Sequence, residues 1–109
     1  MADFYAKVGD VGRTIETQIL DAAGNPIDIT SATVTFRMWH SGASSAKVNA
    51  AATVVDGPNG KASYTWAAGD TDTAGDWLAD WNIVITAGVN VLTVPTDGWN
   101  HVLITSSVP

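Results

Sequence analysis

The chain has 109 residues, of which 46% are hydrophobic and only 15% are charged, and its formal net charge is −6. This length suits a single domain with a modest core. Its five basic residues are scattered along the sequence, which argues against direct nucleic-acid binding. No apolar run reaches the roughly 18 residues that a membrane span needs. The lack of cysteine excludes disulfides and thiolate metal sites.

The N-terminal segment, residues 1–11, lacks the basic and then apolar pattern of a secretory signal, so we expect synthesis and assembly in the cytoplasm. Phe4 and Tyr5 are apolar anchors within this segment. Terminal segments are loose unless something ties them down. We therefore expect either an arm that docks onto a neighbouring subunit or an extra edge strand, ahead of a domain at residues 12–109.

Apolar residues alternate with polar ones in the first third of the chain, which predicts β-strands near 13–20 and 32–39. Between them, residues 21–26 combine Gly, Asn and Pro, the chemistry of a turn. The segment 47–55 is a weaker prediction, because its three consecutive alanines favour helix intrinsically. We predict a single strand there because a Gly- and Pro-containing turn bounds it at 56–60.

Four further strands are expected in the second half of the chain. The segment 60–66 places Ala62, Tyr64 and Trp66 on one face. The longest apolar row runs over 77–85, and two final strands near 90–95 and 99–105 are joined at residues 95–98. About seven short strands with regular turn signals predict an all-β fold, an antiparallel β-sandwich of immunoglobulin-like type.

Five tryptophans in so short a chain suggest either a large aromatic core or a sugar-binding surface. Trp66, Trp77 and Trp81 share strand faces with other apolar residues, so we expect them in the core. Trp39 lies with Arg37 on the opposite face of its strand, and Trp99 follows a Gly-containing turn. Each of these two tryptophans is either buried or exposed to a partner, and a second layer would be needed to bury Trp39. Because an exposed Trp near an Arg is a common interface anchor, we predict that these three residues contact a partner.

The acidic corner around Gly75 contains Asp70, Asp72 and Asp76, and oxygen-rich loops can hold calcium. The spacing misses the calcium-loop pattern, so we expect these carboxylates to bond local backbone amides instead. The only histidines, His40 and His101, sit in no nucleophile motif. We therefore expect no enzyme activity, no metal and no cofactor.

Several short motifs occur in an order that is similar to the immunoglobulin-like N-terminal domain of phage baseplate upper proteins and related small phage structural proteins. The motifs are Gly9-Asp10, Leu20 to Thr30, Val34 to Met38, Gly60 to Trp66, Asp70-Thr71, Gly75 to Trp77, Thr93 to Pro95 and Val102 to Ile104. The likeness spans residues 8–105, and its specificity comes from the order of the motifs. It departs from receptor-binding assemblies in having no fibre or head domain.

This resemblance implies a component of the virion: a capsid decoration, neck, tail or baseplate subunit that binds other virion proteins. Its partners would be major capsid, neck or tail proteins, and a homo-oligomer is compatible with it. Candidate contact residues are Phe4, Tyr5, Arg37, Trp39 and Trp99. The alternative is a carbohydrate-binding module that adheres to host glycans through Trp39 or Trp99.

Overall fold

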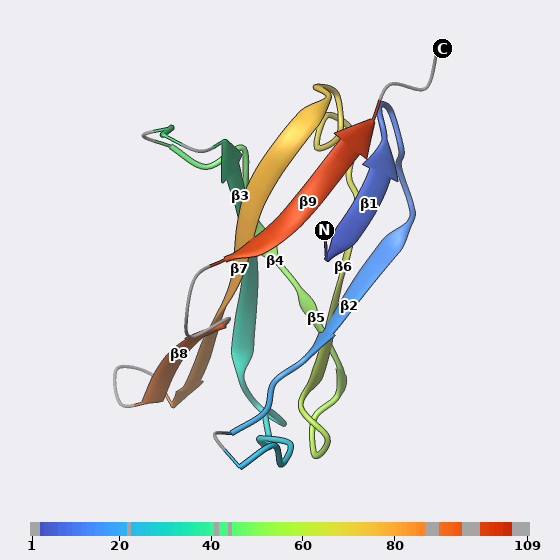
Figure 1. Cartoon of the computed structure of the whole chain (residues 1–109). Helices are drawn as coiled ribbons and strands as arrows, with labels where there is room; N and C mark the ends of the chain where they lie inside the picture. Colours follow the sequence, from blue (N-terminus) through green and yellow to red (C-terminus); the bar gives the residue numbers. More distant parts are fainter. Residues whose placement is uncertain are drawn as a thin grey trace.

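A computed structural model of the chain describes residues 3–21, 23–40, 42–43, 45–86, 90–94 and 99–105. These residues form two facing β-sheets (Figure 1). The strands are β1 Phe4–Lys7, β2 Thr14–Gln18, β3 Thr33–His40, β4 Val48–Ala51, β5 Thr53–Asp56, β6 Lys61–Thr65, β7 Gly75–Thr86, β8 Asn90–Val94 and β9 Asn100–Thr105. The predicted all-β sandwich is confirmed, whereas the immunoglobulin-like connectivity stays a prediction.

The larger sheet has the order β1-β9-β7-β3-β4, and β8 also pairs with β7. The smaller sheet has the order β2-β6-β5. Strand β7 is the centre of the larger sheet, because β3 covers one of its flanks while β9 and β8 follow one another along the other. The described residues contain no helix of the length and apolarity that a membrane crossing needs.

Side-chain alternation places the predicted residues in the core between the sheets. Phe36 of β3 stacks on Tyr64 of β6, with ring centroids 4.9 Å apart, and meets Trp81 of β7 at 4.8 Å. Trp66, Trp77 and Trp81 are 1%, 5% and 0% exposed, which confirms their predicted burial. These rings come from both sheets, so their contacts hold the two layers together.

The prediction of one strand over residues 47–55 is wrong, and the described residues form nine strands where the sequence predicts about seven. The chain forms β4 on the edge of the larger sheet and then, after Ala52, β5 on the edge of the smaller one. Val48, Ala50, Ala52 and Val54 are all buried or partly buried. Because the alternation continues without interruption across the change of sheet, the sequence pattern carries no sign of it.

Strand β1 lies in the N-terminal segment, where the sequence predicts either a docking arm or an extra edge strand. Phe4–Lys7 pairs in parallel with β9 and forms an edge strand of the chain's own sheet. Phe4 lies against the core with its ring centroid 6.3 Å from that of Trp81, and Ala6 is buried. The predicted join at 95–98 and the first two residues of the N-terminal segment lie outside the described residues.

Candidate functional site

The outer face of the larger sheet carries a cluster of aromatic and charged side chains. Arg37 and Trp39 leave β3 on the side opposite its buried residues, as their parity predicts. The antiparallel register places Arg37 opposite Asp80 of β7 and Trp39 opposite Leu78. The cluster is therefore built by cross-strand neighbours on two central strands, which is a rigid support for a binding site.

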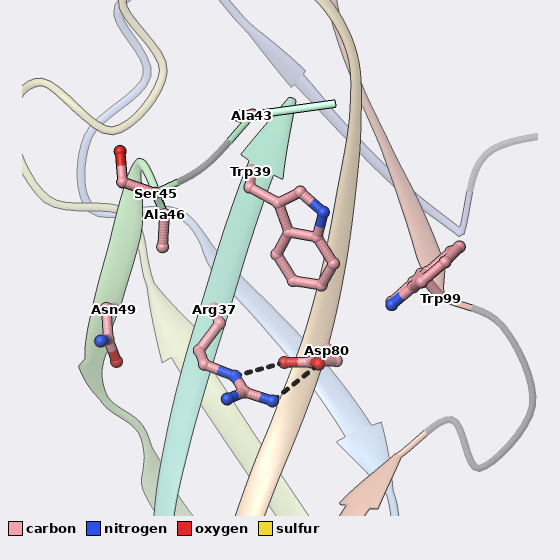
Figure 2. A pocket seen from close by; sticks show the side chains of 8 residues that line it. All are labelled: Arg37, Trp39, Ala43, Ser45, Ala46, Asn49, Asp80 and Trp99. Atoms are coloured by element: carbon pink, nitrogen blue, oxygen red, sulfur yellow. Dashed lines mark hydrogen bonds and ion pairs between the residues drawn. The ribbon is translucent and has the colours of Figure 1, made fainter. Parts of the chain in front are cut away.

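Arg37 and Asp80 form a bidentate ion pair in this cluster (Figure 2). Arg37 donates from Nε to Asp80 Oδ1 at 2.7 Å and from Nη2 to Oδ2 at 2.8 Å. The Asp80 side chain is only 7% exposed, while that of Arg37 is 36% exposed. The hydrogen bonds with Asp80 raise the pKa of Arg37 above its ordinary value. The pair gives the face a polar but electrically neutral floor.

Two tryptophans lie beside this pair. The rings of Trp39 and Trp99 have centroids 6.2 Å apart and stand nearly perpendicular, at 89°. Trp99 comes directly before β9 and is 53% exposed. Together they border an open cavity of about 410 Å³ (Figure 2). The cavity is lined by Arg37, Trp39, Ala43, Ser45, Ala46, Asn49, Asp80 and Trp99.

The position of the cavity follows from the pairing of β7. Its first part, Gly75–Ala79, pairs with β9, and its last part, from Trp81 onward, pairs with β8. Asp80 falls between the two paired stretches, at a break along this flank of the sheet. Trp99 enters at the same break, because it precedes the first residue of β9.

The structure brings together three of the five predicted contact residues: Arg37 and Trp39, which are neighbours on β3, and Trp99, which is far from them in the sequence. The other two lie on β1 and outside this cavity: Phe4 faces the core, and Tyr5 is 58% exposed. Sequence analysis missed Asp80 and Asn49. The alternation along its strand places Asp80 on the outer face, so the sequence indicates an outward carboxylate. It does not indicate the strand register that sets Asp80 opposite Arg37.

The free edge of β1 is partly closed by the turn that follows it. The Val8 backbone N–H donates to the Thr105 carbonyl of β9, so the backbone groups of Val8 point toward the sheet. Neighbouring residues of a strand point their backbone groups in opposite directions. Lys7 therefore faces outward, where its N–H donates to Asp10 Oδ2 and its carbonyl accepts from the Asp10 N–H. Only a short stretch around Tyr5 is left on this edge to accept a strand from a partner.

The carboxylates of the acidic corner are engaged separately. Asp70 Oδ2 accepts hydrogen bonds from the Ala67 N–H at 2.8 Å and from the Tyr64 hydroxyl, so its predicted capping role is confirmed. Asp72 accepts from Lys47, which lowers the pKa of Asp72. Asp76 lies 3.5 Å from His101 Nδ1. Within the described ranges, no three such groups converge as a metal site would require.

Comparison with solved structures identifies a neighbour among phage proteins. The structure is similar to the N-terminal domain of phage TP901-1 ORF48, with a TM-score of 0.66 and 16% sequence identity, over 94% of this chain and 83% of that one. No protein-family model matches the chain, and no curated protein matches it. At this identity the likeness establishes a shared fold: the chain has the architecture of a domain from a phage protein.

Proposed function

We propose that this protein is a non-enzymatic structural subunit of a bacteriophage virion that docks onto other virion proteins. The observation that carries the proposal is the shared fold with a domain of a phage protein over nearly the whole chain. The order of motifs in the sequence supports the same assignment. The subunit would be assembled into particles in the host cytoplasm, as a capsid decoration or as a neck, tail or baseplate adaptor.

The cavity between Trp39 and Trp99 is the proposed docking site. Trp and Arg are enriched among side chains that dominate interface energies, and here Arg37 and Trp39 on β3 are grouped with Trp99, which directly precedes β9. Because Asp80 already neutralises Arg37, burying this face against a partner leaves no unpaired charge. Many copies on a symmetric particle would convert a modest contact into firm attachment.

The direct test is incorporation into particles. The gene is replaced in its phage by a Trp99→Ala variant, and copies per purified particle are counted by quantitative mass spectrometry. Val55→Ala is the matched control, because Val55 is similarly exposed, at 52%, but lies on the smaller sheet. We expect the Trp99 variant to be depleted and the control to be retained. Absence of the unmodified protein from particles would refute the proposal.

Carbohydrate binding is the second candidate function. It is favoured by one observation: the two tryptophans proposed for sugar stacking lie at the same cavity, next to polar side chains. A glycan array separates the two functions. Saturable binding to host-surface sugars that Trp39→Ala and Trp99→Ala abolish would support the second candidate.

A further inference from the structure

The polar groups that the Trp39–Trp99 cavity offers to a ligand are mostly hydrogen-bond donors. A guanidinium has five N–H donors, and two of those of Arg37 are used by Asp80, which leaves three. Among the five indole N–H groups, all within the described residues, only that of Trp77 donates a hydrogen bond, to the Thr73 carbonyl. Within the described part of the chain, the N–H groups of Trp39 and Trp99 meet no acceptor, so we count them among the donors that the site offers.

Acceptors are scarce at the same place. Among the described residues of the lining, the only carboxylate belongs to Asp80, whose side chain is 7% exposed and has both oxygens bonded to Arg37. Asn49 and Ser45 add an amide and a hydroxyl, which both donate and accept. The complementary ligand is therefore rich in carbonyl oxygens and poor in N–H and O–H groups.

The shape of the site adds a second requirement. The two indoles contact each other in a T-shaped arrangement, with centroids 6.2 Å apart and planes at 89°, and form one aromatic corner of the cavity. Figure 2 shows the Trp99 nitrogen turned toward Trp39 and Asp80, so a donor lies at this corner. Aromatic walls with interspersed donors suit a polyproline II segment, whose rings pack against indoles and whose carbonyls point outward to accept hydrogen bonds.

From this complementarity we infer that the cavity binds a proline-rich, extended segment of a partner protein. The inference rests on the proposed docking function and adds the chemistry of the segment that docks. Proline removes the backbone N–H, so such a segment brings acceptors without donors that the site cannot satisfy. A sugar fits less well, because each of its hydroxyls also brings a donor. An anionic ligand fits less well too, because the floor is neutral and the chain carries a net charge of −6.

The experiment is an NMR titration of the ¹⁵N-labelled protein with an acetylated and amidated hexaproline peptide. The five indole N–H signals are the readout. We expect the signals of Trp39 and Trp99 to shift saturably while those of the buried Trp66, Trp77 and Trp81 stay in place. A Gly-Ser hexapeptide of equal length, which carries a full set of N–H groups, is the control probe and should cause no saturable shift.

Variants locate the binding and keep folding separate from it. Trp99→Ala should weaken hexaproline binding by about 10-fold or more, as expected for an interface anchor. Val55→Ala should leave it unchanged, and unshifted signals of the three buried indoles will show that both variants are folded. Loss of binding in the Val55 variant as well would refute the assigned site.

Three outcomes would overturn the inference: no shift with hexaproline, equal shifts with the Gly-Ser peptide, or saturable shifts of the same two signals with cellotriose alone. The last outcome would instead support the carbohydrate candidate. Failure here is distinguishable from failure of the proposed function. If the Trp99 variant is lost from particles although hexaproline does not bind, docking stands and only the chemistry of the docked segment is wrong.

Discussion

Removing either partner of the Arg37–Asp80 pair should have unequal consequences, because the two side chains are buried to different extents. In Arg37→Met the carboxylate of Asp80, only 7% exposed, loses both hydrogen bonds. Breaking a fully buried pair typically costs about 3–5 kcal/mol. Because this pair borders an open cavity, water can return to the carboxylate, and we expect a smaller loss of about 2–3 kcal/mol in the free energy of unfolding.

Asp80→Asn keeps the side-chain shape and leaves a guanidinium that is already 36% exposed. That charge can be solvated, so we expect a loss of only about 1 kcal/mol. The double variant has no unpaired charge and should lose about 1–2 kcal/mol, less than the sum of the single losses. Urea unfolding at neutral pH, followed by far-ultraviolet circular dichroism, measures all four proteins. Equal losses in the two single variants, or strict additivity in the double, would refute this account of the pair.

Three other predictions concern the stability of the scaffold. Gly60→Ala should lower the free energy of unfolding in urea by about 3 kcal/mol or more, because Gly60 has φ +68° and an added Cβ would lie 2.6 Å from the Ile19 carbonyl oxygen. Gly69→Ala, where φ is +90° and the space is open, should lower it by only about 1 kcal/mol. Equal losses in the two variants would contradict the steric argument. Phe4→Ala should lower the free energy of unfolding by about 2 kcal/mol, because the Phe4 ring contacts Trp81. Tyr5→Ala should change it by less than about 0.5 kcal/mol, because Tyr5 is exposed. A similar thermal midpoint for both variants would show that β1 does not pack as described. Burial and the hydrogen bond to Asp70 raise the pKa of Tyr64, so the folded state keeps this phenol neutral while the unfolded state ionises from about pH 10. The free energy of unfolding should therefore fall as the pH rises above about 10, and Tyr64→Phe should remove that part of the loss. Urea unfolding of both proteins at about pH 9 and about pH 11 will measure the difference.

The inner faces of the sheets could be predicted from the sequence because side-chain alternation has a strict period of two. Trp66, Trp77 and Trp81 were assigned to the core in this way, and Trp39 to the opposite face. The same rule failed at residues 47–55, where β4 passes into β5. Alternation reports which side of the backbone is buried and carries no information on which sheet supplies the hydrogen bonds.

The candidate site was predicted only in part for a related reason. Parity placed Arg37 and Trp39 on an outer face, but the register between β3 and β7 depends on pairing across more than forty residues, from position 37 to position 80. No local pattern indicated that Asp80 would lie opposite Arg37. Trp99 is positioned by the break between β8 and β9, which is a property of the sheet and not of the residues around it.

At the break between its β9-paired and β8-paired stretches, strand β7 contributes to the core on one face and to the cavity on the other. Packing fixes the inward side chains of β7, which include Trp77, Ala79 and Trp81. Asp80 faces the Trp39–Trp99 cavity, whose other lining residues come from other segments of the chain. Substitution of an exposed residue of the cavity such as Trp99, which is 53% exposed, can therefore change the cavity walls without altering this interior packing. If the proposed docking function holds, such a fold would allow its specificity to change at the exposed cavity walls, and it offers protein engineers a recess that can be varied while the inward-facing core stays the same.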